Sequence, residues 1–383
     1  MSSNISEKLS KKLKIALVAG EESGDQLGGP LINSLKNHFP EASFIGVGGP
    51  LMIQEGLDSF FSIEKISVMG IIEPLLRLPE LIKLRLQLKR YLFEQEPDLF
   101  IGIDSPDFNL PISRFLKKNL DIQTIQYVSP SIWAWRKGRL KVIEKSVDRV
   151  LTLFPFEEKS YKNSTVEVTY VGHPLADKLG PHEDKQAARL GRGIKDNQKA
   201  IALLPGSRRS EVSIMSPLVI EASKMIQKTD PSAKFFMPLV DETHRRFIPE
   251  DLDIDHINFS YGDSQEVLSL SDLGIVTSGT ASLEALLVRT PVVVAYRTNW
   301  LNYAIIKPLL NIKHISLPNL LSDKDLLPEL LQKEVTPKNI FRAYKKLDEA
   351  RIKICLQEFE KIHSQLKAGG SRKVSATISE IFK

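Results

Sequence analysis

Two carboxylates, Asp104 and Asp107, follow directly after a short apolar run at residues 99–103. Apolar runs of this length are typical of buried strands. In open α/β sheets, reactive groups gather beyond the carboxyl ends of the strands. A carboxylate in that place can act as a general base toward an incoming nucleophile. We therefore predict that Asp104 is catalytic and that Asp107 contacts the substrate, with helix capping as the alternative role for both.

The turn at residues 205–211 has the composition of an anion-binding site. It follows an apolar run and opens a helical pattern, whose N-terminal amides would favour an anion. Gly206 permits close approach of the backbone, and Arg208 can add a charge-assisted contact to a phosphate. The Gly-Lys-Ser/Thr ending of a Walker loop is missing. A helix cap with a surface arginine is the alternative interpretation.

A second such turn contains Ser278, Gly279 and Thr280, again between an apolar run and a helical pattern. We predict that these three residues bind phosphate. Glu284 lies one helical turn beyond Thr280, on the same face of the helix. A carboxylate there could accept hydrogen bonds from the ribose hydroxyls of a nucleotide, and the alternative is an ordinary exposed glutamate.

Two tryptophans lie close together in residues 128–136, and aromatic side chains of this kind commonly stack on sugar faces or acyl chains. We predict substrate contacts for Trp133 and for the nearby cation Arg136, with core packing of the aromatic residues as the alternative. His173 follows a strand pattern and is also expected to contact ligand. Ser23, in the glycine-containing loop after the first strand pattern, is expected to line the acceptor side of the site.

The sequence contains no pattern for a metal or a tightly bound cofactor. Its seven histidines are scattered without paired metal-ligand spacing, and the loops at residues 20–25 and 46–49 do not complete a dinucleotide fingerprint. No Gly-x-Ser-x-Gly elbow supports a serine hydrolase. We therefore predict no metal and no cofactor.

The elements that must position these residues alternate along the chain. Apolar runs predict strands at residues 13–19, 43–47, 99–103, 122–128, 149–154, 168–171, 200–204, 234–239, 257–261, 273–277 and 291–296. Helical patterns lie between several of them, which favours βαβ units and parallel sheets. The alternation weakens after Gly180 and resumes near residue 200, and the chain is helical from about residue 336. This predicts an α/β fold with two Rossmann-like domains whose parallel sheets face a central cleft, followed by a helical C-terminus.

Size and composition agree with two globular domains. The chain has 383 residues, of which 42% are hydrophobic and 26% charged. The single cysteine, Cys355, excludes an intramolecular disulfide and fits a reducing compartment. The net charge of +5 is modest, and zinc-finger spacing and RNP-like motifs are missing, so we predict no nucleic-acid partner.

Residues 68–84 combine apolar and basic side chains. This segment is too interrupted to span a bilayer, but it could lie on a membrane surface or accept lipid chains. A buried amphipathic helix is the alternative.

Together these motifs resemble those of the lipid-A-disaccharide synthases, a family of GT-B glycosyltransferases. The resemblance extends from about residue 14 to about residue 339. It is carried by residues 19–25, 68–70, 102–109, 127–136, 204–211, 278–284 and 316–321. The motifs at 102–109 and 127–136 are the most specific, whereas the two phosphate-type turns occur more widely among nucleotide-sugar enzymes.

The resemblance implies a reaction and its substrates. UDP-2,3-diacylglucosamine would donate its sugar to the 6-hydroxyl of 2,3-diacylglucosamine 1-phosphate (lipid X), with inversion. Asp104 matches the family's candidate base, and Arg208 matches a residue associated with the donor diphosphate. Asn319 is expected near the donor, and Arg297 is included among the substrate-binding residues.

The resemblance also implies where each part of the chain works. Residues 1–180 would form an acceptor-binding, membrane-contacting domain, and residues 181–350 a domain that binds the UDP-sugar. Residues 351–383 would pack back on the first domain, or swap between the subunits of a homodimer. The expected location is the cytoplasm, peripheral to the inner membrane of a Gram-negative bacterium.

One residue departs from the resemblance. Gln126 occupies a strand-end position where members of this family carry His. Glutamine can donate a hydrogen bond but cannot transfer a proton near neutral pH. The departure is harmless if this side chain only positions other groups, and it puts the mechanism in doubt if the side chain relays a proton.

Two alternatives to the implied function stay open at the level of sequence. One is another GT-B nucleotide-sugar enzyme, either a UDP-GlcNAc transferase or a 2-epimerase. The other is a catalytically silent protein that binds nucleotide sugars or lipids. The tryptophan segment and the apolar, basic segment argue against an epimerase with a water-soluble substrate, and the presence of Asp104 and Arg208 argues against a silent protein.

Overall fold

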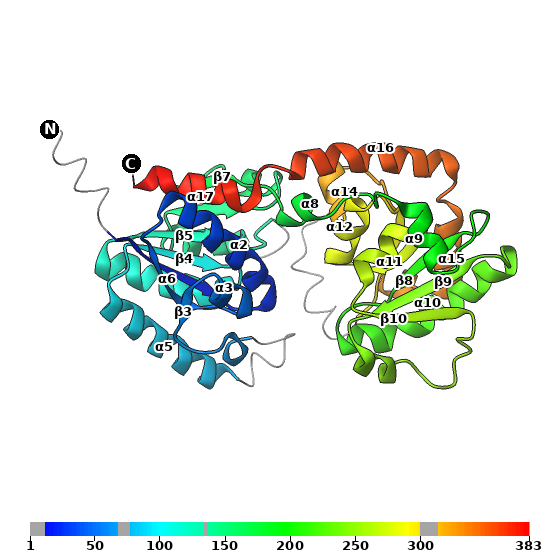
Figure 1. Ribbon diagram of the computed structural model, residues 1–383, viewed down its shortest axis with the longest axis horizontal. Coiled ribbons are helices and arrows are strands. Elements are labelled where there is room, and N and C mark those ends of the chain that lie inside the picture. Colours follow the sequence, from blue (N-terminus) through cyan, green and yellow to red (C-terminus); the bar gives the residue numbers. More distant parts are fainter. Residues whose placement is uncertain (1–11, 68–76, 134–136, 299–312, 383) are drawn as a thin grey trace. The chain divides into compact units, whose positions relative to one another are not determined.

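The computed structural model describes residues 12–67, 77–133, 137–298 and 313–382 (Figure 1). The chain divides into two compact units. The first contains Met1–Pro174 and Lys367–Lys383, and the second contains Leu175–Leu366. Each unit is built on a parallel sheet with helices on its faces. Two Rossmann-like α/β domains and a helical C-terminus are therefore confirmed.

The described strands of the first unit form a seven-stranded sheet in the order β3-β2-β1-β4-β5-β6-β7, with every pair parallel. Their bounds are β1 (Lys14–Ala19), β2 (Ser43–Val47), β3 (Leu57–Ser59), β4 (Leu99–Ile103), β5 (Gln123–Tyr127), β6 (Arg149–Thr152) and β7 (Glu167–Tyr170).

The apolar runs in this sheet are continuous because both of its faces are buried. Alternate residues of β1 enter different cores: Leu17 packs on one side of the sheet, and Val18 packs on the other. In β4, Ile101 shares the first core and Phe100 the second. The flanking helices are α2 (Glu22–His38), α3 (Pro50–Gln54), α5 (Leu78–Gln95), α6 (Pro106–Leu120), α7 (Leu140–Glu144) and α17 (Gly370–Ile381).

The C-terminal helix α17 belongs to this first unit, where it lies beside α2 (Figure 1). Val374 and Ile378 are fully buried in the same core as Leu17. The hydroxyls of Ser34 and Ser375 meet at 2.7 Å between the two helices. The end of the chain thus completes a domain that begins at its start.

The second unit repeats this topology in its described part, with six parallel strands in the order β10-β9-β8-β11-β12-β13. The strands are β8 (Ala200–Leu204), β9 (Lys234–Leu239), β10 (Ile257–Tyr261), β11 (Leu273–Thr277), β12 (Val292–Tyr296) and β13 (Glu329–Leu331). The helices are α8 (Pro174–Lys178), α9 (Lys185–Gly191), α10 (Arg209–Thr229), α11 (Ser264–Leu270), α12 (Thr280–Leu287), α14 (Leu317–Ser322), α15 (Pro337–Lys345) and α16 (Glu349–Leu366).

The main core of the second unit lies between its sheet and the helices α10 and α15. Leu203 and Phe235 from the sheet pack there with Met215 of α10 and Ile340 of α15, all of them fully buried. Helix α16 packs on α12 and α14 within this same unit. Of the two last helices, α17 lies on the first unit and α16 on the second.

Along the chain, the boundary between the first unit and the second falls between Pro174 and Leu175. The sequence suggested a domain junction near Gly180. No helix in the described ranges combines the length and the apolar character needed to cross a bilayer.

Candidate active site

The order of each sheet reverses at one point, between β1 and β4 in the first unit and between β8 and β11 in the second. Ligands of open α/β sheets bind beyond the carboxyl ends of the strands at such a point. Asp104 follows β4, and the residue 20–25 loop follows β1. The turn with Arg208 follows β8, and the turn with Ser278 follows β11. The predicted chemical groups therefore lie where open α/β sheets generally bind their ligands.

In the first unit, the structure brings Ser23 to Asp104. The Ser23 hydroxyl donates to the Asp104 carboxylate at 3.3 Å, and the Asp104 side chain is half-buried. Gly20, in the same loop as Ser23, leaves room for the neighbouring Ser105, because a Cβ atom at Gly20 would lie 2.4 Å from the Ser105 hydroxyl. Asp104 is thus an accessible carboxylate with a hydroxyl group beside it.

Asp107 lies in the first turn of α6, where its exposed carboxylate forms an ion pair with Arg139. Arg85 of α5 donates to the main-chain carbonyl of Asp107 at 3.2 Å. Asp25, by contrast, is buried and accepts hydrogen bonds from the main-chain amides of Gly49, Leu51 and Met52. Asp25 therefore caps α3.

Trp133 and His173 belong to an aromatic cluster at the carboxyl ends of β5, β6 and β7. The Trp133 ring meets Phe156 edge-to-face at 4.9 Å, and Phe156 stacks on Phe154 at 5.5 Å. His173 lies 5.3 Å from the Phe154 ring, and burial lowers the pKa of His173 to about 4. The imidazole is consequently neutral at physiological pH.

A buried carboxylate, Glu157, supports this cluster and was missed in the sequence. Its Oε2 atom accepts hydrogen bonds from the main-chain amides of Leu153 and Phe154, both at 3.0 Å. Its side chain is also hydrogen-bonded to the indole of Trp133. Burial raises the pKa of Glu157 to about 7, although these three donors favour the ionised form. Acidic residues in turns are usually solvated, so the local sequence gave no signal.

In the second unit, the turn after β8 is shaped by Gly206 and Glu211. Gly206 has a φ of 121°, and a Cβ atom there would lie 2.5 Å from the Glu211 Cβ. The Glu211 carboxylate accepts from the main-chain amides of Ser207 and Arg208 at 3.2 and 3.3 Å. Arg208 is exposed and pairs with Glu211 at 3.2 Å. Because exposed ion pairs are weak, this guanidinium can turn to an anionic ligand at little cost.

His244 is a second polar side chain beside this turn that the sequence did not reveal. One ring nitrogen lies 3.1 Å from the Ser207 carbonyl and the other lies 2.9 Å from the Asp241 carboxylate. Hydrogen bonds from Thr243 and His244 lower the pKa of Asp241 to about 2.

The turn after β11 exposes Gly279 and Thr280 at the N-terminus of α12. Gly279 has a φ of 151°, which few other residues adopt. The Ser278 hydroxyl donates to the Ile315 carbonyl at 2.9 Å, so its oxygen is left as an acceptor. Glu284, half-buried on α12, accepts a hydrogen bond from Gln265 at 3.0 Å.

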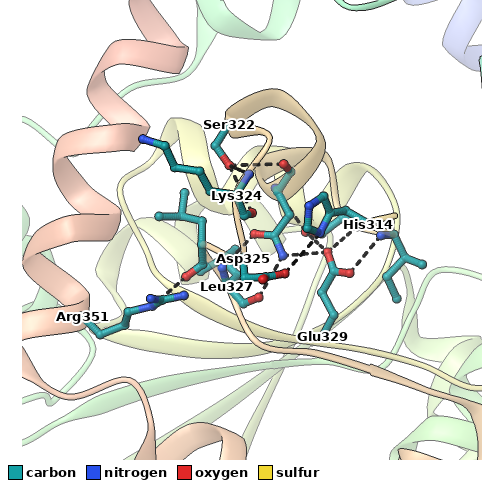
Figure 2. Close-up of polar contacts among 11 residues, drawn as sticks. His314, Ser322, Lys324, Asp325, Leu327, Glu329 and Arg351 are labelled. Atoms are coloured by element: carbon teal, nitrogen blue, oxygen red, sulfur yellow. Dashed lines mark hydrogen bonds and ion pairs between the residues drawn. The ribbon is translucent and has the colours of Figure 1, made fainter. Parts of the chain in front are cut away.

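Asn319 lies behind this turn and is hydrogen-bonded to Glu329 and Leu327. Figure 2 shows Glu329 and Leu327 within a network of polar contacts. The Asn319 amide donates to Glu329 and to the Leu327 carbonyl, both at 2.9 Å, and its oxygen accepts from the Leu327 amide at 2.8 Å. Glu329 also accepts from the main-chain amide of Ile315, whose carbonyl receives the Ser278 hydroxyl. Asn319 is fully buried, and its amide is used in supporting the turn.

Arg297 is exposed directly after β12, at the same edge of the sheet as Arg208. Arg136 and residues 68–76 lie outside the described residues, so their predicted roles have no structural counterpart. From residue 77 onward, α5 exposes Leu78, Ile82, Leu86 and Phe93. No three His, Cys, Asp or Glu side chains in the described part of the chain are grouped as metal ligands.

Comparisons with known proteins place these features in a family. The family model of lipid-A-disaccharide synthetase matches residues 15–382. Lipid-A-disaccharide synthases from Alcanivorax borkumensis and Idiomarina loihiensis are each 42% identical to the chain; the matches cover 96% of it and 97% and 98% of those proteins.

Solved structures show the fold. UDP-GlcNAc 2-epimerase from Neisseria meningitidis matches with a TM-score of 0.64 at 13% identity, covering 96% of this chain and 99% of that one. Acinetobacter baumannii MurG matches with a TM-score of 0.58 at 12% identity, covering 97% and 100%. The fold is that of the GT-B enzymes, and the sequence match over nearly the whole length shows that the chain belongs to the lipid-A-disaccharide synthetase family.

Proposed function

We propose that this protein is an inverting glycosyltransferase of lipid A biosynthesis. It transfers the sugar of UDP-2,3-diacylglucosamine to the 6-hydroxyl of 2,3-diacylglucosamine 1-phosphate. A β-1,6-linked disaccharide 1-phosphate forms and UDP leaves. The observation that carries this proposal is the half-buried carboxylate of Asp104 just beyond β4, with the Ser23 hydroxyl 3.3 Å away.

Inversion requires one displacement and therefore one base. The Asp104 carboxylate takes the proton of the acceptor's 6-hydroxyl while the hydroxyl oxygen attacks the anomeric carbon of the donor. Ser23 orients the carboxylate through its hydrogen bond. The indole of Trp133, fixed by Phe156 and Glu157, provides an apolar face for the acceptor. Asp107 and His173 complete the acceptor side.

The leaving diphosphate needs positive potential in place before the bond breaks. Arg208 and the N-terminal amides of α10 supply it on one side, and the amides of Gly279 and Thr280 supply it on the other. Glu284 accepts the ribose hydroxyls. Arg297 contributes a further cation at this edge of the sheet. Asn319 has an indirect role, because it is bonded to Glu329, which holds the Ile315 loop that accepts the Ser278 hydroxyl.

Both substrates carry acyl chains, so the enzyme must meet a membrane surface. The exposed apolar side chains of α5 have helical spacing and alternate with Lys83, Arg85 and Arg90. Such a face suits the anionic, cytoplasmic side of the inner membrane. In this proposal the first unit binds the acceptor and the second binds the UDP-sugar.

The decisive test is disaccharide formation by the purified protein with both lipid substrates in detergent micelles. We expect disaccharide and UDP in equal amounts, and no UDP release when the acceptor is omitted. Release of UDP without acceptor would indicate an epimerase instead. UDP binding without any product would indicate a silent binding protein or a different acceptor. The relatives, all named lipid-A-disaccharide synthase, do not favour either alternative.

A further inference from the structure

The main chain at Asp104 has a left-handed conformation that residues with a side chain rarely adopt. The φ angles are 52° at Asp104 and 37° at Ser105. At the end of the neighbouring strand, β-branched Val128 has a φ of 77°. Such conformations persist only where the surroundings hold them, and they cluster at functional sites. The contacts that hold this backbone therefore decide where the Asp104 carboxylate points.

Two buried amide side chains hold the carbonyl of Asp104. Gln126 Nε2 and Asn109 Nδ2 each donate to it at 2.9 Å. The Asp104 N–H donates to the Tyr127 carbonyl, also at 2.9 Å. Gln126 and Asn109 are both completely buried. The peptide groups on both sides of the Asp104 Cα are thus fixed by the protein interior.

Gln126 also connects the two strained strand ends. Its Nε2 lies 3.3 Å from the Val128 carbonyl, so one amide group serves both Asp104 and Val128. Gly102 makes room for this arrangement: a Cβ atom there would lie 2.8 Å from the Asn109 Cβ and 3.0 Å from Gln126 Oε1. The glycine in the middle of β4 is needed because the two amides approach the strand there.

We propose that Gln126 is a positioning residue for the Asp104 carboxylate, acting as a neutral hydrogen-bond donor to the Asp104 carbonyl. This inference rests on the proposed function, in which Asp104 is the base. The Gln126 amide nitrogen donates to the main-chain carbonyls of Asp104, Tyr127 and Val128. A glutamine amide does not titrate near neutral pH, so it holds the backbone and relays no proton.

The test compares Gln126→Met, which keeps the volume and removes the donor, with Gln126→His, whose ring N–H restores a donor. Thr124→Val is the matched control. Thr124 is equally buried on the same strand, and its hydroxyl bonds to Asp148 at 2.9 Å and to the Ser146 carbonyl at 3.2 Å, away from Asp104. Disaccharide formation, the KM of each substrate, and Tm are measured for all three variants.

We expect Gln126→Met to lower kcat by about 10- to 100-fold while both KM values stay within about threefold, because the base is displaced and the binding groups are not. Gln126→His should recover most of this loss. Its kcat–pH profile should coincide with that of the unmodified enzyme, since neutral and protonated imidazole both donate. Thr124→Val should lower Tm and leave kcat unchanged.

Full kcat in Gln126→Met would overturn the inference. The inference would also fail if Tm, KM and kcat all changed together in Gln126→Met and Thr124→Val reproduced this pattern. It would fail as well if Gln126→His did not recover activity, or if the kcat–pH profile of Gln126→His showed a new titration. Asp104→Asn in the same assay separates the two levels. If that variant is inactive and Gln126→Met is fully active, the inference alone fails. If Asp104→Asn is fully active, the base assignment fails and the inference fails with it.

Discussion

The proposed chemistry rests on single residues at the edge of each sheet. Asp104 is a half-buried carboxylate that accepts a hydrogen bond from the Ser23 hydroxyl. Arg208 is exposed and held loosely by Glu211. The first suits a proton acceptor, and the second suits a group that must turn to a diphosphate.

Replacing Asp104, the proposed base, should separate the chemical step from substrate binding. We expect Asp104→Asn to lower kcat by roughly 10²–10⁴-fold, since the amide cannot accept the proton, with UDP binding nearly unchanged. Product formation and UDP titration measure the two effects. The control is Asp121→Asn, a second aspartate with a left-handed backbone, φ 52°, at the far end of α6. Comparable losses in both variants would contradict the role of Asp104.

Removing the guanidinium should weaken the donor side. We expect Arg208→Ala to raise the KM of the UDP-sugar and lower kcat, because charge on the leaving diphosphate grows in the transition state. Arg342→Ala, an exposed arginine of the same unit, is the control. Initial rates over a range of UDP-sugar concentrations measure both changes. An unaltered KM and kcat in Arg208→Ala would show that Arg208 does not belong to the donor site.

At the scale of elements, the turn after β6 connects three strand ends. Glu157 binds the amides that follow β6 and the indole that follows β5, while His173 after β7 packs against the same aromatic cluster with its ring tilted. The Ser129 and Tyr161 hydroxyls meet at 2.8 Å beside it. A carboxylate with a raised pKa at this junction makes the stability of the first unit depend on pH.

The sign of this dependence follows from proton binding. The pKa of Glu157 is raised from 4.5 to about 7, so the native state holds a proton there that the unfolded state releases. Stability therefore falls as the pH rises from about 4.5 to about 7, by on the order of 3 kcal/mol. Glu157→Gln should lack this fall, whereas Glu158→Gln, at the exposed neighbour, should retain it. Urea unfolding at several pH values measures the difference, and parallel curves for all three proteins would contradict it.

At the scale of the whole molecule, the chain returns to its first domain. Helix α17 begins where the Gly370 amide donates to the Val171 carbonyl at 3.0 Å, just beyond β7. Its buried side chains enter the core formed by β1 and β4. The last residues thus stabilise the sheet that carries Asp104, although they are the most distant from it in sequence.

Because α17 packs in this core, truncating a single buried aliphatic side chain of the helix should strongly lower stability. Ile378→Ala should destabilise the first unit by about 2–5 kcal/mol through lost burial and a cavity. Arg372→Ala, at an exposed position of the same helix, should change stability by less than about 0.5 kcal/mol. Thermal or urea unfolding measures both. Equal effects of the two substitutions would contradict the buried position of α17.

The sequence by itself determined the local features. Apolar runs gave the bounds of β2, β4, β8 and β11 as the structure has them, because a strand buried on both faces must be apolar throughout. Turn residues at the ends of those strands located Asp104, Arg208 and the residues around Gly279. The three-residue strands β3 and β13 were missed, since they contain too few residues to show a pattern.

Only the tertiary structure decided which distant groups meet. An amphipathic helix does not specify the core it will join, so the division of α16 and α17 between the two units could not be read locally. Three further features could not be read from the local sequence: the inward-facing amide of Asn319, the burial of Glu157, and the hydrogen bond from Gln126 to the Asp104 carbonyl. The partners of Asn319 lie 8 and 10 residues away and Asp104 lies 22 residues from Gln126, whereas Glu157 bonds amides only 3 and 4 residues away. In each case burial and hydrogen bonding exist only once the chain has folded.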